Sequence, residues 1–239
     1  FQDLEGSCQR QVMSFVPPPS WWDFFMKLTL NTNKEVYEEF SHISELFPSY
    51  RCYLVGGCVR DSLLSRPSKD IDIATSCSPV LVHSLFPDGT YYPKYGTTSF
   101  KKDGFEVTIA SLRKETAYLD FRHPSKIEFV SDIKEDYVRR DFTINALYVD
   151  SFLNLIDPSR LGLADIKNRL IRMIGNPDFR LKEDPLRMIR AYRFSLELGF
   201  ILESSLEESI LRNLELIHRL KPVKIKEEIN KLSNQHKDE

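Results

Sequence analysis

Two aspartates one residue apart, Asp70 and Asp72 in the run KDIDIAT, are the side chains of this chain with the clearest chemical potential. In an extended strand successive side chains alternate between faces, so both carboxylates are expected to point to one side, with Ile71 and Ile73 buried on the other. Two carboxylates held this close repel each other unless a divalent cation lies between them. The spacing therefore predicts a strand that binds a metal ion.

Two glycines, Gly56 and Gly57, end an apolar run shortly before these aspartates and open a helix. Glycine lets backbone amides approach a phosphate closely, and a helix N-terminus attracts anions. Arg60, one turn into the helix, is expected to reach a phosphate oxygen with its planar guanidinium. A plain strand–helix turn would explain the glycines alone, but the acidic pair that follows favours a nucleotide site.

A site that clamps two metal ions for phosphoryl transfer needs a further acidic ligand. Glu106, on an expected strand over Phe105–Ile109, is our candidate, provided that this strand lies beside the one that carries Asp70 and Asp72. The alternative is a glutamate that faces solvent. Together the three carboxylates predict a Mg²⁺ site.

A third segment, RRDFTIN, combines charge with an amide. Arg140 and Asp141 are adjacent, and Asn145 follows Asp141 at the spacing of one helical turn. These residues could together hold a ribose and a phosphate. Alone, the same pattern would more often be a capped helix with a surface ion pair.

A helix expected over residues 183–199 carries charge next to an apolar arc. At about 100° per residue, Leu186, Ile189 and Leu196 form that arc, and Arg193 projects into it. We expect the Arg193 charge to be partly buried and to have a partner. Arg187, Arg190 and Arg193 step round the helix by about 60° each toward this arc, so Arg190 lies between the other two.

The same helix offers a possible base-reading pair, Asp184 and Arg187, three residues apart. Cytosine and adenine both present an amine next to a ring nitrogen, so a carboxylate accepts from the amine while a guanidinium donates to the nitrogen. Uracil and guanine present a carbonyl in place of the amine. The pair would thus admit C and A and refuse U and G. The alternative is an ordinary ion pair, such as Glu183 with Arg187, worth about 0.3–0.5 kcal/mol.

The bulk composition describes an ordinary globular protein of 239 residues, with 41% hydrophobic and 28% charged residues and a net charge of −2. Between Arg160 and Arg193 nine basic residues outnumber four acidic ones, so a polyanion-facing surface is possible there, although solvated helix faces would explain it as well.

The four cysteines lack metal-site spacing, which favours a reduced cytoplasmic protein. No apolar stretch approaches the roughly 20 residues needed to span a membrane, and nothing indicates the oligomeric state.

Element patterns place strands early and helices late, which predicts an α+β head followed by a helical region. We expect a lead-in over residues 1–32, a head over 33–158 and helices over 159–239. The expected head elements are helices over 33–47, 59–64 and 78–86 and strands over 52–55, 70–74, 97–101, 105–109 and 127–130, followed by a short element over 146–149. The expected later helices cover 161–169, 177–199, 203–219 and 222–233.

In this order, the runs LVGGCVRDSLL, KDIDIAT, RRDFTINAL and KEDPLRMIRAYRFSLELGF resemble the class II tRNA nucleotidyltransferase family, which includes CCA-adding enzymes and bacterial poly(A) polymerases. The resemblance covers about residues 50–232. It implies a nucleotidyltransferase head with a mixed β-sheet and an all-helical neck. It also implies that Asp70 and Asp72 bind magnesium, and that Gly57, Arg60 and Arg140 contact the triphosphate and sugar. The nucleotide-reading set would be Asp184, Arg187, Arg190 and Arg193.

The implied activity is template-independent addition of C, A or both from CTP and ATP to the tRNA 3′ end, with release of pyrophosphate. The run YGTT over residues 95–98 resembles CCA-adding enzymes rather than poly(A) polymerases, and the segment Leu112–Pro124 resembles the loop associated with the switch from C to A addition. Poly(A) polymerase activity on general RNA and a non-catalytic nucleotide- or RNA-binding module are the alternatives. The family's helical body and tail have no counterpart before Glu239, so we expect weak tRNA binding unless another part supplies that surface.

Overall fold

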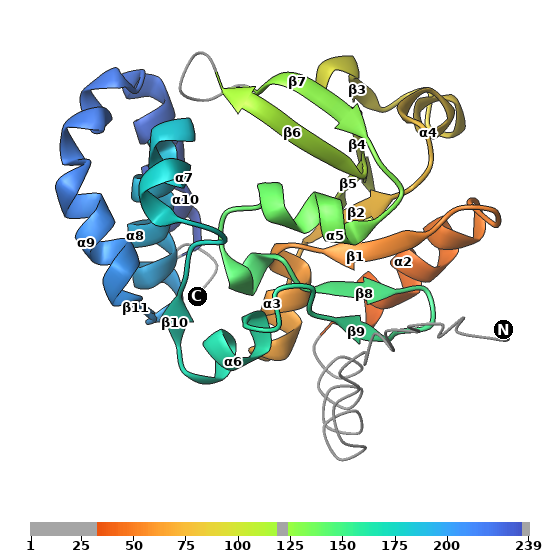
Figure 1. Ribbon diagram of the computed structural model, residues 1–239. Coiled ribbons are helices and arrows are strands. Elements are labelled where there is room, and N and C mark those ends of the chain that lie inside the picture. The colour runs from red at the N-terminus through yellow and green to blue at the C-terminus, as the bar shows by residue number, and fades with distance from the viewer. Residues whose placement is uncertain (1–32, 119–123, 236–239) are drawn as a thin grey trace, which may run out of the picture.

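The computed structural model describes residues 33–118 and 124–235. A mixed β-sheet with helices forms the head, and a group of helices forms the neck beside it (Figure 1). The α+β organisation expected from the order of strands and helices is therefore confirmed. The lead-in expected over residues 1–32 lies outside the described residues.

The head contains the following elements in chain order: α2 (Lys34–Glu45), β1 (Cys52–Val55), α3 (Gly57–Leu63), β2 (Asp70–Thr75), α4 (Pro79–Leu85), β3 (Thr90–Tyr92), η1 (Pro93–Tyr95), β4 (Thr97–Lys102), β5 (Phe105–Ser111), β6 (Arg113–Tyr118), β7 (Pro124–Phe129), α5 (Ile133–Asp136), η2 (Tyr137–Arg139), η3 (Thr143–Asn145), β8 (Tyr148–Asp150) and β9 (Leu155–Ile156). The later elements are α6 (Gly162–Lys167), β10 (Leu170–Ile171), α7 (Pro177–Glu183), α8 (Leu186–Leu198), β11 (Ile201–Leu202), α9 (Ser204–Arg212), η4 (Leu214–Arg219) and α10 (Pro222–Gln235).

The main sheet has the strand order β3-β4-β5-β2-β1-β8-β9. Strands β4 and β5 form the expected hairpin, whose turn at Asp103 and Gly104 has positive φ at both residues, as a tight hairpin turn requires. Strand β5 then pairs with β2 in parallel, which places Glu106 opposite Asp70. The strand that carries Glu106 therefore lies beside the strand that carries Asp70 and Asp72, as its candidate role as a third acidic ligand requires.

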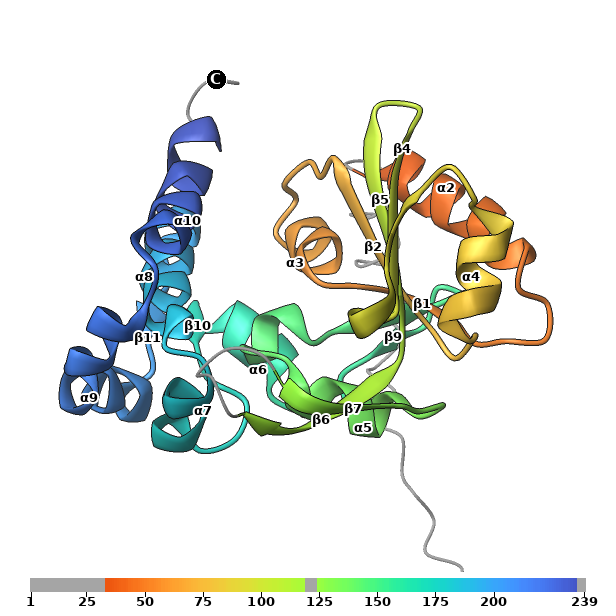
Figure 2. The same cartoon turned by 90° about the horizontal axis from the view of Figure 1, so that it is seen from above.

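The two faces of the main sheet are covered differently. One face packs Leu54, Ile73 and Ile109 against helices α2, α3 and α4, and Figure 2 shows α2 and α4 on one side of the sheet. On the other face, Tyr53 and Tyr148 pack with residues at the base of β6 and in α5. The polar residues of β2 lie on this second face.

A second core lies in the neck, to which α7, α8, α9 and η4 contribute, and Phe142 and Ile144 of the head are part of it. The buried stripe of α8 contains Met188, Ala191 and Phe194. The expected arc was partly wrong, because Leu196 is 73% exposed. The neck is helical as expected, and in addition β10 and β11 form a short parallel pair.

The continuous helix expected over 177–199 is wrong, since α7 ends at Glu183 and α8 begins at Leu186. Pro185 causes the break. Proline has no N–H to donate, and it disfavours the helical conformation of the residue before it. Asp184 accordingly has φ −146° and ψ 96°, which is extended backbone.

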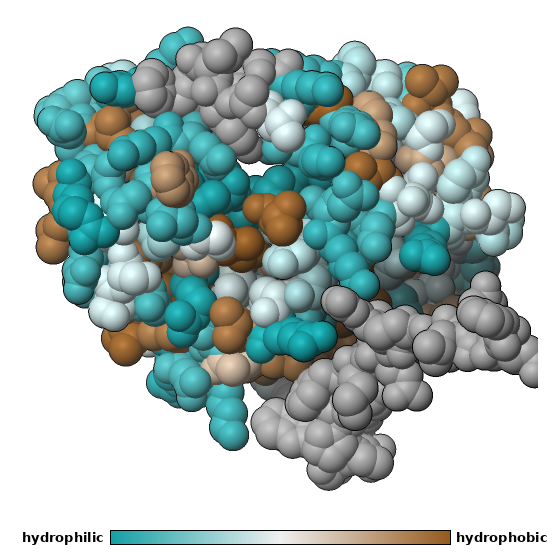
Figure 3. Space-filling model, viewed as in Figure 1, coloured by the Kyte–Doolittle hydropathy of each residue, from teal (hydrophilic) through white to brown (hydrophobic). Residues whose placement is uncertain are grey.

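The face of the molecule seen in Figure 3 is mostly polar. Figure 3 shows that hydrophilic side chains predominate where the neck meets the head, with hydrophobic side chains in small separate groups. Within residues 33–118 and 124–235, no helix combines the length and the hydrophobicity that crossing a membrane would require.

Candidate active site

Strand β2 presents Asp70 and Asp72 on the sheet face opposite to helices α2 and α4. Ile71 and Ile73, which alternate with them, are 0% and 1% exposed and belong to the main core. Asp70 is exposed and Asp72 is half-buried. The alternation predicted from the sequence is thus confirmed, and both carboxylates share one face.

The neighbouring strands extend this polar face into two rows. Glu106 lies opposite Asp70 and Lys101 opposite Glu106, which forms the first row across β2, β5 and β4. Thr108 lies opposite Asp72, and its hydroxyl is 3.1 Å from that of Ser99, which forms the second row. Sequence reasoning missed the two hydroxyl residues, whose only signal was their even spacing from Glu106 and Lys101.

The glycine turn lies directly against the second aspartate. Gly56 has φ +84° and ψ −144°, a conformation that is essentially restricted to glycine. A Cβ built on Gly56 would stand 2.9 Å from Oδ2 of Asp72. The turn that could cradle a phosphate and a carboxylate that could hold a metal ion are therefore neighbours, as the sequence predicted.

The electrostatics of the site reflect concentrated negative charge. Burial raises the pKa of Asp72 to about 6, Asp70 and Glu106 add to the rise, and the guanidinium of Arg140 opposes it. Burial and the nearby Glu106 also raise the pKa of Asp70, while Lys231 opposes the rise. In the described parts of the chain, the side chains of Asp70, Asp72 and Glu106 have no hydrogen-bond or ion-pair partner.

This donor set fits a hard divalent cation. Carboxylate oxygens are the ligands that Mg²⁺ prefers, and it is commonly held by one or two carboxylates together with substrate phosphates rather than by a complete protein cage. Among the described residues no three acidic, histidine or cysteine side chains already form such a cage. As they stand, Asp70, Asp72 and Glu106 are donors spread along two adjacent strands.

Arg60 borders the glycine turn but is bound to protein groups. Its Nη2 would lie 3.6 Å from a Cβ on Gly57. The guanidinium pairs with Asp61 at 2.9 Å and donates to Oδ1 of Asn145 at 2.8 Å. It also lies 5.1 Å from the ring centroid of Phe194 in the neck. Arg60 therefore links the turn to the neck.

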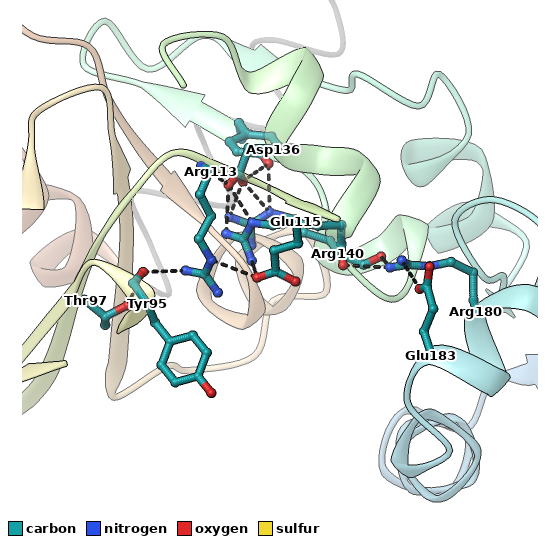
Figure 4. A network of polar contacts seen from close by, with 10 residues as sticks. Tyr95, Thr97, Arg113, Glu115, Asp136, Arg140, Arg180 and Glu183 are labelled. Carbon is teal, nitrogen blue, oxygen red and sulfur yellow. Dashed lines mark hydrogen bonds and ion pairs between the residues drawn. The ribbon is translucent and has the colours of Figure 1, made fainter. Parts of the chain in front are cut away.

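Arg140 is held beside Asp72 by a buried acid. Its guanidinium donates to Asp136 at 3.0 and 3.1 Å and to the hydroxyl of Tyr148 at 2.7 Å (Figure 4). Tyr148 in turn donates to Asp136. Arg139 pairs with the same carboxylate at 2.8 Å. Asp136 and Tyr148, which sequence reasoning missed, thus fix an arginine whose charge acts on Asp72.

The three residues expected to act together in RRDFTIN are only partly brought together, since Asn145 interacts with Asp141 but each of the three also has a partner elsewhere. Asp141 pairs with Arg190 of α8, and despite burial this guanidinium holds the pKa of Asp141 below its usual value. Asn145 accepts from Arg60. The expected helical turn between Asp141 and Asn145 is absent, because Phe142 is extended and only Thr143–Asn145 is helical.

The base-reading candidates lie where α7 meets α8. Asp184 occupies the break between the helices, and its Oδ1 accepts from the N–H of Leu186 at 3.1 Å. Arg187 is 5% exposed and pairs with Glu183 at 2.9 Å. The Glu183–Arg187 pair, considered from the sequence as the alternative to base reading, is therefore present.

The predicted burial and pairing of Arg193 are confirmed. It is 9% exposed, pairs with Glu228 of α10 at 2.9 Å and with Glu197 at 2.7 Å, and lies 4.0 Å from the ring centroid of Phe194. These contacts hold α10 against α8. The role of Arg193 toward a nucleotide stays a prediction.

The segment that resembles a switching loop is described only in part. Residues 119–123 lie outside the described residues, while β6 and β7 on either side pair with each other. At the start of β6, Arg113 donates to Glu115 at 2.8 Å and to the carbonyl of Tyr95 at 2.9 Å (Figure 4). The base of the segment is therefore fixed to the main sheet.

Comparison with known proteins gives a consistent result. A family model described as the poly A polymerase head domain matches residues 52–172. The CCA-adding enzyme of Lactobacillus delbrueckii subsp. bulgaricus is 42% identical over 185 residues, which are 77% of this chain and 46% of that enzyme. The CCA-adding enzyme of Geobacillus stearothermophilus is 40% identical over 184 residues, 77% of this chain and 45% of that enzyme. The chain spans about half the length of these curated relatives.

The solved structures that this chain resembles are of the same kind of enzyme. The Bacillus stearothermophilus CCA-adding enzyme in complex with CTP matches with a TM-score of 0.72 and 35% identity, over 83% of this chain and 48% of that one. A tRNA nucleotidyltransferase complexed with a primer tRNA and an incoming ATP analog matches with a TM-score of 0.65 and 30% identity, over 80% of this chain and 55% of that one.

Proposed function

This chain belongs to the tRNA nucleotidyltransferase and poly(A) polymerase family, and we propose that it adds C, A or both from CTP and ATP to the 3′ end of tRNA without a template. The single observation that carries the proposal is the position of Asp72. Its carboxylate lies against the Gly56 turn, on the same sheet face as Asp70 and Glu106. A phosphate cradle beside carboxylates suited to Mg²⁺ is what phosphoryl transfer from a nucleoside triphosphate needs.

In the proposed reaction the 3′-hydroxyl oxygen of the RNA forms a bond to the α-phosphorus of the nucleotide. The bond from that phosphorus to the bridging oxygen breaks, pyrophosphate leaves, and the hydroxyl proton passes to solvent. Asp70 and Asp72, with Glu106 on the adjacent strand, would hold Mg²⁺. When bound, this ion would lower the pKa of the attacking hydroxyl and stabilise charge on the phosphate.

The remaining roles fall to side chains of this chain. The amides of the turn at Gly56 and Gly57, together with the positive charge of Arg60 and Arg140, would orient the triphosphate. In the neck, Asp184 and Arg187 would read the base through its amine and adjacent ring nitrogen. Arg190 and Arg193 of α8 would complete the nucleotide-facing wall, while Asp141 and Asn145 would act near the ribose.

Because the chain spans about half of its curated relatives, the activity of the whole protein is part of the proposal. Poly(A) polymerase activity on general RNA 3′ ends is the second candidate, since the matching family model is named for the head domain of that enzyme. The run YGTT and the CCA-adding relatives favour tRNA as the substrate.

The test is incubation with Mg²⁺, CTP and ATP, supplied separately and together, and tRNAs that end before, within and after CCA. Product lengths distinguish C addition, A addition, complete CCA addition and unlimited polymerisation. Asp70→Ala is expected to abolish incorporation while changing nucleotide affinity by less than roughly tenfold, because phosphate and base contacts remain.

An unstructured RNA of equal length is the substrate control. Long A tracts on that RNA would support poly(A) polymerase instead. Nucleotide binding without incorporation on any RNA would support a non-catalytic module, and normal turnover by Asp70→Ala would refute the metal assignment.

A further inference from the structure

Arg180 of α7 contacts the head as well as its own helix. The residue is 9% exposed, and its Nη2 donates to the backbone carbonyls of Arg139 and Arg140 at 2.7 Å each (Figure 4). The planar guanidinium presents its donors in a fixed fork, so two bonds to consecutive carbonyls set both distance and direction. A neck side chain therefore fixes the backbone of a head segment.

That head segment carries Arg140, whose positive charge opposes the rise that burial causes in the pKa of Asp72. The side chain of Arg140 is bound to Asp136 and Tyr148 and acts electrostatically on Asp72. A shift of the Arg140 backbone would displace this guanidinium relative to the sheet. The bond from Arg180 to the Arg140 carbonyl thus helps to fix the position of the Arg140 guanidinium, which acts electrostatically on Asp72.

The other end of the Arg180 guanidinium faces the base-reading candidates. Its Nη1 pairs with Oε2 of Glu183 at 2.5 Å, and the same oxygen pairs with Arg187 at 2.9 Å. Arg187 also donates to the backbone carbonyl of Arg180 at 2.6 Å. Arg187 is therefore bound directly to the backbone of residue 180, and it is linked to the Arg180 guanidinium through the shared carboxylate of Glu183.

From these contacts we propose that Arg180 is a positioning residue for base selection, an inference that rests on the proposed function. It holds Arg187 at a fixed distance and angle from the head segment that orients the triphosphate. A base is read correctly only when its edge meets Arg187 while its phosphates lie on the glycine turn, so both ends of the nucleotide must be located in one frame. Arg180 is the side chain that binds both parts of that frame.

Loss of the Arg180 side chain is expected to reduce the discrimination between CTP and UTP more than it lowers the stability of the fold. A reading group displaced by a fraction of an ångström loses directional hydrogen bonds to the correct base, while phosphate contacts remain equal for all four nucleotides. We expect Arg180→Met to lower the preference for CTP over UTP by at least about tenfold. The KM for CTP should rise while the weak use of UTP stays nearly unchanged.

The experiment measures Mg²⁺-dependent affinity and incorporation kinetics for CTP, ATP and UTP in the wild type, Arg180→Met, Arg187→Ala and the double variant. Arg172→Met is the matched control, because Arg172 is a neck arginine bound to two acids, Asp165 and Glu203, that lie outside these contacts. Thermal unfolding is followed for every variant. Arg180→Gln, which keeps amide donors, replaces Arg180→Met and is judged by the same ratios if the methionine variant does not fold.

If Arg180 acts through Arg187, the double variant discriminates no worse than Arg187→Ala alone, and Arg172→Met keeps the wild-type ratio. Additive losses, an unchanged ratio in the Arg180 variant, or an equal loss in Arg172→Met would overturn this inference and leave the proposed function intact. A wild-type protein that neither binds nor incorporates CTP or ATP would overturn both.

Discussion

The position of the Asp72 carboxylate depends on Gly56, the residue that it contacts. Gly56 has no side chain, and the space that a Cβ would need is occupied by the Asp72 carboxylate. The same position requires φ +84°, which side chains with a Cβ rarely adopt. Gly56 therefore meets two separate requirements: a positive φ in the turn, and space for the Asp72 carboxylate. Substitutions can distinguish the two.

Gly56→Ala is expected to reduce incorporation about a hundredfold, since displacement of a reacting group by about 1 Å has an effect of that order. It should also lower the free energy of unfolding by about 1–3 kcal/mol, through backbone strain. Gly104→Ala is the control, because Gly104 also has positive φ, +86°, but nothing lies within 4 Å of its Cβ. It should cost about 1 kcal/mol and leave incorporation unchanged.

Urea unfolding and single-nucleotide incorporation measure the two effects. Equal losses of incorporation in both glycine variants would contradict a specific contact between the turn and Asp72.

Arg187→Ala tests base reading at the level of one side chain. Without the guanidinium, no group donates to the ring nitrogen shared by C and A, so preference for these bases over U should fall by roughly tenfold or more. Competition between labelled CTP and UTP measures the preference. If it stays at the wild-type value, Arg187 serves only its ion pair with Glu183.

The segment α5–η2 is an element organised around one buried acid. Asp136 is 0% exposed, accepts from the N–H of Arg113 at 3.1 Å, and pairs with Arg139 and Arg140. Despite burial, the two guanidinium groups hold the pKa of Asp136 well below its ordinary value of 3.8. The acid thus joins β6, η2 and β8 around the site.

Asp136→Asn is expected to destabilise the protein by about 3–5 kcal/mol at pH 7, because two buried arginines lose their counter-charge. The folded-state pKa lies below the unfolded value, so the ionised carboxylate stabilises the fold above about pH 4, and this contribution is lost as pH falls through the folded pKa. The difference between the wild type and the variant should therefore shrink in acid.

Urea unfolding at pH 7 and near pH 3 measures this prediction. Tyr148→Phe, which removes only the hydroxyl between Asp136 and Arg140, should cost about 1–2 kcal/mol at pH 7. A pH-independent loss in Asp136→Asn would show that packing rather than charge is responsible.

At the scale of the whole molecule, the end of α8 is one of the places where the head and the neck meet. The Glu197 side chain is 3% exposed and lies 2.7 Å from Arg193 of the neck and 3.7 Å from Arg60 of the head. The backbone carbonyl of Glu197 accepts from Arg66 in the loop before β2 at 2.9 Å. One helix end therefore couples the two parts.

Glu197→Gln is expected to lower the free energy of unfolding by about 1–3 kcal/mol, since Arg193 and Arg60 each lose one of their two acidic partners and keep only Glu228 and Asp61. It should also broaden the unfolding transition, because the head and neck would lose part of their coupling. Glu208→Gln is the control, as Glu208 is 67% exposed in its pair with Arg212 and should cost less than about 0.5 kcal/mol. Equal effects of both variants on calorimetric unfolding would contradict this coupling.

Local pattern was enough to predict much of this protein. Alternation along β2 put Asp70 and Asp72 on one face, the hairpin turn followed from Asp103 and Gly104, and the burial of Arg193 required a partner. These features depend on neighbours in sequence, whose geometry is set by backbone angles and side-chain periodicity. The break at Pro185 had a signal in the sequence as well, which helical periodicity alone did not capture.

Only the tertiary structure decided which distant groups meet. Glu106 faces Asp70 because β5 pairs in parallel with β2, and Arg180 reaches the carbonyls of Arg139 and Arg140 because the neck packs on the head. Arg60 meets Asn145 in the same way. Such contacts join residues separated by tens of positions, so they depend on strand register and domain packing, which the preferences of individual residues do not specify.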